Sequence, residues 1–406
     1  MKKKAALRFS AAAIAVAALP FAVTRTITNP PDVNKLLNAA VDFTAPGSVV
    51  TEKIDFGNDN IVLYKPAPPA AEITAKSETE PPAAQLTAAE ETASSSSAEA
   101  QSENTDSPLI LQDNPQTEEE KYIITQNISD QIEDLSVFNS RDLPVEEMTY
   151  KPNGGSNFID LPMGGQVRNC TDLENDFVKE QSKIGSDIRI EPYSENPQVL
   201  IMHTHACESY LTGEGLYQDE SYTCRTTDST QSVVAVGQKI AEKLAGNGIC
   251  VIHDGTLHDY PLYNGSYDRA EETVTALLEK YPSIKVVLDV HRDGIVESDG
   301  TPVAAVTEIN GRKAAQVMII SAASDGYYHV PNYLENFHFA CELQQQMECD
   351  NPGITRPVLL EYCQYNQHLT TGSLLLEIGA QGNTLEQALY TGELIGESIA
   401  EALLNM

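Results

Sequence analysis

Three short stretches decide the fold: VLIMHTHACES (residues 199–209), VVLDVHRDG (286–294) and SLLLEIGAQGN (373–383). Each contains a brief run of Val, Ile and Leu that is too short for a solvent-facing helix and is typical of a buried strand. In an open α/β sheet, ligands and chemistry gather just beyond the carboxyl ends of such strands. Histidine and carboxylate side chains stand at these ends, and a catalytic zinc site is built from those side chains.

The pattern around these stretches alternates strands with helices over residues 191–406. Such alternation predicts an α/β domain with a mostly parallel, twisted sheet and helices on both faces. The dipeptide Asn310-Gly311 lies between two β-prone runs and predicts a hairpin turn. Thr384, with Gln387 three residues later, is a capping box that predicts the start of the last helix.

The first 24 residues are expected to direct export. Residues 1–24 carry a basic start and then an apolar run, which fits both a cleaved signal peptide and a retained signal-anchor. The positive-inside bias would leave the N-terminus in the cytoplasm. We therefore expect a cell-membrane protein with a single N-terminal anchor and an extracytoplasmic catalytic domain, or a secreted protein if the signal is cleaved.

The segments between this start and the α/β domain differ sharply in composition. Residues 66–120 are rich in Ser, Ala, Pro and Glu and poor in aromatics, so we expect a disordered acidic linker. Residues 25–65 are expected to be a membrane-proximal segment, and residues 121–190 a lead-in that packs on the catalytic domain. The formal net charge of the whole chain, −33, argues against nucleic acid as a partner.

Four side chains are the candidate metal ligands. His291 stands at the tip of its strand and is expected to bind the metal. Of the H-T-H pair we favour His205, one step beyond the strand, with His203 in a supporting role, and the reverse order stays open. Glu208 is either a third ligand, with water in the fourth position, or a carboxylate at a helix N-terminus.

Glu377 is expected to be the general base. A carboxylate on an otherwise apolar strand would cost several kcal/mol to bury without a role, and a base beside a metal would supply that role. Either Asp289 or Asp293 is expected to hold the second ring nitrogen of the metal-binding histidine. Arg225 and Arg292 either contact the substrate or form ordinary salt bridges.

Five stretches, taken in order, carry a resemblance to a known family. They are HTHxxES (203–209), RTTD (225–228), YNGSYDR (263–269), DVHRDG (289–294) and YNQHLTTGSLLLEIGAQGNTLEQA (365–388). Over roughly residues 197–404 the chain resembles the stage II sporulation protein P family, the cell-wall amidase/endopeptidase of forespore engulfment. That family looks like a distant relative of zinc-dependent N-acetylmuramoyl-L-alanine amidases.

The resemblance implies specific roles for residues of this chain. It implies Zn2+ held by His205, Glu208 and His291, with Glu377 as the catalytic base. It also implies peptidoglycan as the substrate, a place between the mother-cell and forespore membranes, and a lytic transglycosylase of the sporulation protein D type as a partner.

Two hypotheses of different classes follow. The first is a zinc hydrolase that cuts the amide between N-acetylmuramic acid and L-alanine, with cleavage of peptide cross-links left open. The second is a non-catalytic peptidoglycan-binding or complex-organising module on an amidase fold. The ordered set of two histidines and two glutamates favours the hydrolase, because a binding module needs no base beside a metal.

Overall fold

A computed structural model of the chain describes the following residues: 49–54, 60–67, 143–212, 217–218, 224–325 and 327–406. The predicted N-terminal segment (1–24) lies outside these residues, as does nearly all of the predicted linker (66–120).

The location predicted from the sequence, a cell membrane with a single N-terminal anchor, is corrected here. In the part of the chain that the structure describes, no helix is both long and apolar enough to cross a bilayer. The anchored location is therefore not supported.

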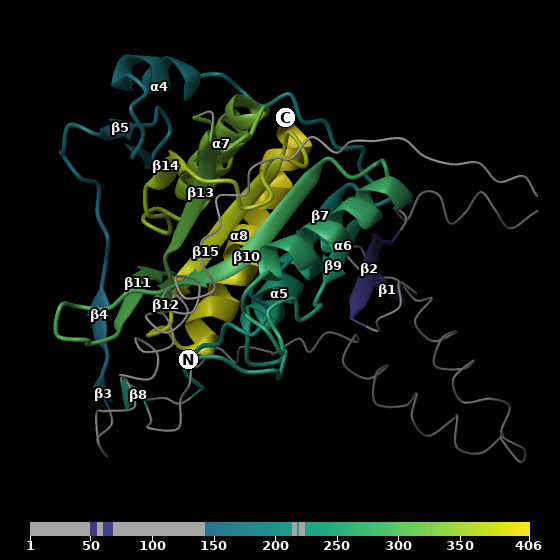
Figure 1. The fold of residues 1–406 in the computed structure, drawn as a ribbon, viewed down its shortest axis with the longest axis horizontal. Coiled ribbons are helices and arrows are strands. Elements are labelled where there is room, and N and C mark those ends of the chain that lie inside the picture. Colours follow the sequence, from purple (N-terminus) through teal and green to yellow (C-terminus); the bar gives the residue numbers. More distant parts are fainter. Residues whose placement is uncertain (1–48, 55–59, 68–142, 213–216, 219–223, 326) are drawn as a thin grey trace, which may run out of the picture. The chain divides into compact units, whose positions relative to one another are not determined.

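A ten-stranded mixed sheet forms the centre, in the order β1-β2-β9-β7-β10-β15-β13-β14-β6-β5 (Figure 1). Five of its nine neighbouring pairs are parallel and four are antiparallel. The predicted α/β class with a mostly parallel sheet is confirmed. The strands are β1 (Val49–Lys53), β2 (Ile61–Pro66), β5 (Phe158–Asp160), β6 (Gln166–Asn169), β7 (Val199–Met202), β9 (Val251–Asp254), β10 (Val286–Asp293), β13 (Val317–Ala323), β14 (Val358–Tyr362) and β15 (Ser373–Ala380).

Helices cover both faces of this sheet. Apolar side chains of α5, α7 and α8 pack in one core against one face, and those of α6 pack in a second core against the other face. The central strands contribute to both cores because their alternate residues point to opposite faces. The helices are α4 (Asn175–Gln181), α5 (Val233–Gly246), α6 (Ser266–Lys280), α7 (Tyr333–Asp350) and α8 (Leu385–Asn405).

The edge strands come from outside the segment 191–406. On one side β1 and β2 form an antiparallel hairpin on β9, and they belong to the segment predicted as membrane-proximal. On the other side β5 and β6, from the predicted lead-in, extend the sheet beyond β14. Val178 of α4 is buried in the larger core. The described parts of both flanking segments therefore belong to the same packed unit as the central strands.

The predicted Asn310-Gly311 turn is present. Both residues have positive φ, 52° and 74°, as a type I′ turn requires. They join β11 (Val303–Ile309) to β12 (Arg312–Ala315) in a small sheet, where β4 (Glu146–Met148) pairs with β11. The following strand does not continue this hairpin: β13 enters the main sheet, because its residues are apolar on both faces. A separate ladder joins β3 (Leu143–Pro144) to β8 (Tyr217–Gln218).

The capping box at the start of α8 is also present, which gives a first prediction. The backbone N–H of Gln387 donates to Oγ1 of Thr384, and the backbone N–H of Thr384 donates to Oε1 of Gln387, each at 3.2 Å. Thr384→Ala should therefore lower the free energy of unfolding by about 1 kcal/mol in urea titrations. Thr275→Ala, at an exposed position of α6, is the control and should change it by less than about 0.5 kcal/mol. Equal effects of the two variants would contradict the assignment.

Candidate active site at the carboxyl ends of β7, β10 and β15

Three neighbouring parallel strands bring the predicted site residues together. β7 and β15 flank β10. The turn His203-Thr204-His205, which we call the His-Thr-His turn, therefore lies beside residues 289–294 at the end of β10 and residues 374–379 of β15. His291 and Glu377 are direct partners in the β10–β15 register. Asp289 pairs with Met202, the residue immediately before the His-Thr-His turn. Residues almost 180 positions apart in sequence therefore share one edge of the sheet.

His291 is the central side chain of the site. It is buried, its Nδ1 lies 3.6 Å from Oε2 of Glu208, and its Nε2 lies 2.8 Å from Oδ1 of Asp289, a contact without hydrogen-bond geometry. Burial acts to lower the pKa of His291, but the charges of Asp289 and Glu208 outweigh it and hold that pKa well above its ordinary value. Metal binding at this ring would therefore displace a proton.

Asp289 is the carboxylate that supports His291. Its two oxygens accept hydrogen bonds from the backbone N–H of Thr204 at 2.8 Å and from Oγ1 of Thr204 at 2.6 Å. Asp293, the other carboxylate considered from the sequence, instead pairs with Nη1 of Arg356 at 2.7 Å. Of the two, Asp289 is thus the one in contact with the ring.

Glu208 directly follows the turn after β7 and forms an isolated antiparallel β-bridge with Arg225. Its side chain is 13% exposed, and Oε2 accepts a hydrogen bond from the backbone N–H of Arg292 at 3.1 Å. Burial acts to raise its pKa, but His291 and Arg292 lower it to about 2, so the group is a carboxylate at neutral pH. The alternative of a helix N-terminal carboxylate is not what the structure shows, because α5 begins only at Val233.

His205 packs edge-on against His291, with ring centroids 5.3 Å apart. Its own ring stacks on that of Tyr263, with centroids 4.5 Å apart and planes 7° from parallel. On the polar side, Nδ1 lies 3.4 Å from Oγ of Ser266 and 3.8 Å from Oδ2 of Asp259. Since the polar partners of this ring in the described chain contact Nδ1, Nε2 is the nitrogen that remains for a metal.

Glu377 supplies a titratable carboxyl beside this cluster. Its Oε2 is buried and has no hydrogen-bond partner among the described residues. Burial, with the charges of Asp293 and Glu208, raises its pKa to about 8, while His291 acts in the opposite direction. A carboxyl with such a pKa exchanges its proton near neutral pH, which suits an acid–base role.

The raised pKa of Glu377 predicts a pH dependence of stability in the metal-free protein. An unfolded chain releases this proton near pH 4.5, whereas the folded chain keeps it until about pH 8. The folded state therefore binds more protons between these values, and its stability falls as pH rises through this window. Glu377→Gln should remove the fall, so urea midpoints should favour the variant increasingly from pH 5 to pH 9. A pH-independent difference between variant and wild type would contradict this.

The side chains of His205, Glu208 and His291 are of the types that bind zinc. The distance between two of them, Glu208 and His291, suits a shared zinc ion. Two imidazoles and a carboxylate are a common set of protein ligands in catalytic zinc sites. The 3.6 Å between Nδ1 of His291 and Oε2 of Glu208 is close to the separation of about 3.3 Å that two ligands have on a tetrahedral zinc. Within the described chain, however, no three His, Cys, Asp or Glu side chains are already grouped as a metal site.

Comparison with known proteins places the chain in a family. The family model described as Stage II sporulation protein P (SpoIIP) matches residues 56–400. The chain belongs to the stage II sporulation protein P family. The stage II sporulation protein P of Bacillus subtilis (strain 168) is 30% identical over 200 residues, which are 47% of this chain and 47% of that protein. The match thus spans about half of the relative's length.

Solved structures give a weaker likeness. N-acetylmuramoyl-L-alanine amidase AmiC2 of Nostoc punctiforme is 14% identical, with a TM-score of 0.32 over 52% of this chain and 97% of that one. The CwlD amidase from Clostridioides difficile, solved in complex with the GerS lipoprotein, is 15% identical, with a TM-score of 0.33 over 51% and 94%.

The two histidines of the His-Thr-His turn have different surroundings in the structure. Nδ1 of His203 lies 2.8 Å from the carbonyl oxygen of Val290, and Nε2 lies 2.9 Å from Nε2 of His253 on β9. Both ring nitrogens of His203 are therefore engaged inside the protein, beneath α5, where a Cβ on Gly237 would lie only 2.5 Å from the ring. The geometry favours His205 over His203 as the residue that faces His291.

The two arginines have internal partners. Arg292 donates to the carbonyl oxygens of Ser209 at 2.9 Å and Cys224 at 2.7 Å, so it ties two loops together. Arg225 pairs with Asp259, and its guanidinium carbon lies 5.0 Å from the centroid of the Tyr263 ring. Arg292 thus holds the loops that carry Ser209 and Cys224 beside the site, and Arg225 forms part of the wall beside His205.

Asp259 and the tyrosines around His205 were not predicted from the sequence. Besides Arg225, Asp259 accepts a hydrogen bond from the backbone N–H of Cys207 at 3.2 Å. Burial and the charge of Asp259 raise the pKa of the Cys207 thiol to about 12, so this thiol is not a ready metal ligand. The sequence feature that could have identified Asp259 is its position a few residues after β9, at the edge of the sheet where β7 and β10 also end.

Proposed function

We propose that this member of the stage II sporulation protein P family is a zinc-dependent peptidoglycan hydrolase that cleaves the amide between N-acetylmuramic acid and L-alanine. The observation that carries the proposal is the direct pairing of Glu377 with His291 across β10 and β15. A proton-exchanging carboxyl thus stands beside the imidazole and carboxylate donors of a metal site. Family membership supports a role in sporulation and peptidoglycan as the polymer that is cut.

In this proposal His205, Glu208 and His291 hold the zinc ion. When bound there, zinc would polarise the scissile carbonyl and make water a better nucleophile. Asp289 keeps the ring of His291 oriented, because Thr204 fixes both of its oxygens. The charges that make Glu208 a carboxylate also keep it ready as a ligand.

Glu377 moves the proton in the proposed reaction. Its carboxylate takes one proton from the attacking water as oxygen bonds to the amide carbon. It then gives that proton to the amide nitrogen as the C–N bond breaks, and the second proton of the water stays on the new lactyl carboxyl group. The lactyl carboxylic acid then passes this proton to the amine of alanine, so the products are a carboxylate and an ammonium group. The absence of a hydrogen-bond partner on Oε2 within the described residues leaves this oxygen available for the transfer.

The test measures metal and hydrolysis on the same full-length sample. We expect about one zinc per chain by elemental analysis and release of dye from labelled cell walls. Chelation should abolish dye release and lower the unfolding midpoint, because zinc stabilises the folded state that binds it, and added zinc should restore both. A zinc-free protein that binds walls without releasing dye would instead identify the non-catalytic module. Cross-link cleavage and a transglycosylase partner stay predictions that the same assay can address with defined substrates.

A further inference from the structure

Tyr267 is an aromatic side chain at the edge of the candidate site. It belongs to the stretch YNGSYDR (263–269), one of the five that carry the family resemblance. It lies in the first turn of α6, one helical turn before Ala270 and two before Val274. Ala270 and Val274 are fully buried in the second core, against β7 and β9, so this stripe directs the ring of Tyr267 toward the sheet.

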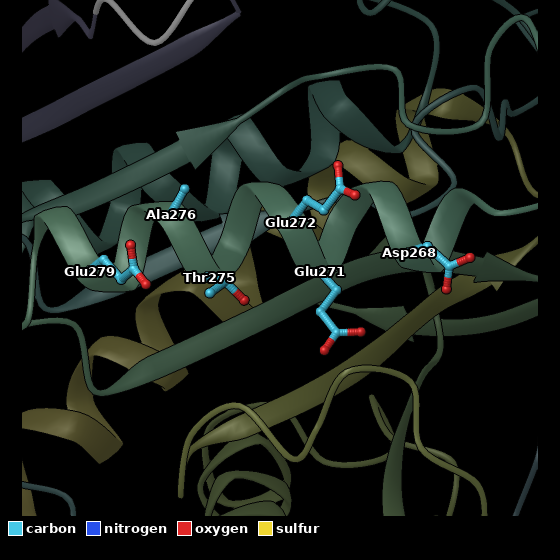
Figure 2. Close-up of a pocket in the computed structure, with 6 residues that line it drawn as sticks. All are labelled: Asp268, Glu271, Glu272, Thr275, Ala276 and Glu279. Carbon is cyan, nitrogen blue, oxygen red and sulfur yellow. The ribbon is translucent and has the colours of Figure 1, made fainter. Parts of the chain in front are cut away.

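The acidic side chains of α6 lie on another part of the helix surface. Figure 2 shows Asp268, Glu271, Glu272 and Glu279 along the helix, where they line a shallow surface hollow. Asp268 directly follows Tyr267, but neighbouring residues of a helix are separated by a rotation of about 100°. Tyr267 and this acidic surface therefore occupy different sides of α6.

The position of Tyr267 is fixed by packing. The centroid of its ring lies 5.5 Å from that of His205, in an edge-on contact, and 5.4 Å from that of Tyr365. Its backbone carbonyl oxygen accepts a hydrogen bond from Nδ2 of Asn366 at 2.9 Å. Tyr365 and Asn366 have positive φ, 44° and 55°, a backbone that occurs mostly where a functional site requires it. The ring is thus in place before any substrate binds.

The hydroxyl of Tyr267 is available as a hydrogen-bond donor. The residue is partly exposed, no described residue forms a hydrogen bond with the hydroxyl, and the protein does not enclose it. Burial raises the pKa of Tyr267 above its ordinary value, and the charges of Asp289, Glu208 and Glu377 raise it further. The hydroxyl is therefore protonated at neutral pH and within reach of the carboxylates that surround His291.

The arginines at this edge of the sheet are already bonded within the described chain. Each guanidinium nitrogen of Arg292 donates to a backbone carbonyl oxygen. Arg225 pairs with Asp259, and Arg356 pairs with Asp293. A new negative charge in the site could be met by these arginines only if existing bonds were broken, whereas the phenol of α6 can donate at once.

We propose that Tyr267 is a catalytic residue, whose hydroxyl donates a hydrogen bond to the carbonyl oxygen of the scissile amide and stabilises the charge that develops there. As the water oxygen bonds to the amide carbon, the carbonyl double bond opens and its oxygen becomes an oxyanion. A donor already in position stabilises such an oxyanion without the cost of reorganisation. At this stage Glu377 holds the proton of the water, so it is neutral and does not repel the oxyanion.

The hydroxyl transfers no proton in this step. Its O–H bond stays intact, and the hydrogen bond weakens again when the C–N bond breaks and the carbonyl forms anew. Glu377 alone moves the proton between water and the leaving nitrogen. This inference rests on the proposed function, because it names a group that stabilises the transition state of that reaction.

The test uses Tyr267→Phe in the full-length protein. Phenylalanine keeps the ring against His205 and removes only the hydroxyl, so folding and zinc content should match the wild type. In dye release, kcat should fall about 10²-fold while KM stays within about threefold, as for other oxyanion donors. Tyr281→Phe is the matched control, because Tyr281 lies at the other end of α6 and packs against the second core. Its kcat should stay within about twofold of the wild type.

A second measurement requires no turnover. In a phosphonamidate analogue of N-acetylmuramoyl-L-alanine, a tetrahedral phosphorus replaces the amide carbon and carries an anionic oxygen in the place of the oxyanion. Its Kd should rise about 10²-fold in Tyr267→Phe and stay unchanged in Tyr281→Phe, because the hydrogen bond is made to the transition state. The proposal is overturned if kcat or this Kd is unchanged in Tyr267→Phe, or if that variant loses its zinc.

The two proposals can fail separately. If hydrolysis needs zinc and Glu377 but Tyr267→Phe cuts walls like the wild type, only the role of Tyr267 is wrong. If the analogue distinguishes the wild type from Tyr267→Phe but walls are never cut, the hydrolase proposal fails while the hydroxyl stands as an oxyanion donor. A wild type that does not bind the analogue overturns the role of Tyr267 whether or not walls are cut.

Discussion

Replacing Glu377 with glutamine is expected to lower the turnover of wall hydrolysis by about 10²–10⁴-fold, the usual contribution of a positioned acid–base group. Glutamine keeps the size of the side chain but cannot carry the proton between water and the leaving nitrogen. The metal content should stay at the wild-type value, because Glu377 is not among the proposed ligands. Dye release and elemental analysis on one preparation measure both quantities.

Glu361→Gln is the matched control for this experiment. Glu361 lies on β14, two strands from β15 in the same sheet, and partial burial raises its pKa as well. It does not face His291, so its variant should keep wild-type turnover. Loss of zinc from Glu377→Gln would make Glu377 a ligand, and turnover near that of the wild type would reduce it to a structural group.

The second large effect is expected for His291→Ala. This change removes the imidazole that lies between Glu208 and Asp289, so both bound zinc and wall hydrolysis should be lost. The folded state should survive, because the apolar residues of β10 on both faces of the sheet are untouched. Elemental analysis, dye release and a far-ultraviolet circular dichroism spectrum measure the three outcomes.

His338→Ala provides the comparison for that loss. His338 lies on α7, where its Nε2 contacts Oε1 of Gln181 at 2.9 Å, and it has no contact with the site. Its replacement should leave zinc content and hydrolysis at wild-type values. A His291→Ala protein that retains stoichiometric zinc would show that the metal, if present, is held elsewhere.

Much of the fold could be predicted because its signals are local. The apolar runs, the turn at Asn310-Gly311 and the capping box at Thr384 depend on residues within a few positions of each other, and the structure contains each of them. The edge strands were harder to recognise. The hairpin of β1 and β2 packs on β9, nearly 200 residues later in the chain, and no pattern within residues 49–66 indicates that partner.

The candidate site, like the fold, was predicted in part from local sequence and depends in part on long-range packing. Apolar runs that end in His291 and Glu377 imply that both residues lie at the carboxyl ends of strands, since parallel neighbours end at the same edge of a sheet. That the two residues are direct partners follows from the strand order β7-β10-β15 and its register, which long-range packing sets. The sequence determines which acidic and basic side chains stand at the strand ends, and the register determines which of these side chains are in contact.

The two histidines of the His-Thr-His turn show most clearly that the sequence alone does not determine which groups are in contact. From the sequence alone, His203 and His205 differ only in lying two positions apart along the chain. In the folded protein His203 is bonded to His253 and to the carbonyl of Val290, respectively 50 and 87 positions away, whereas His205 faces His291. Residue types and local periodicity thus determined the strands, the turns and the set of candidate donors. Tertiary packing decided which donor is free, because a ring nitrogen is available only when no distant part of the chain has already bonded it.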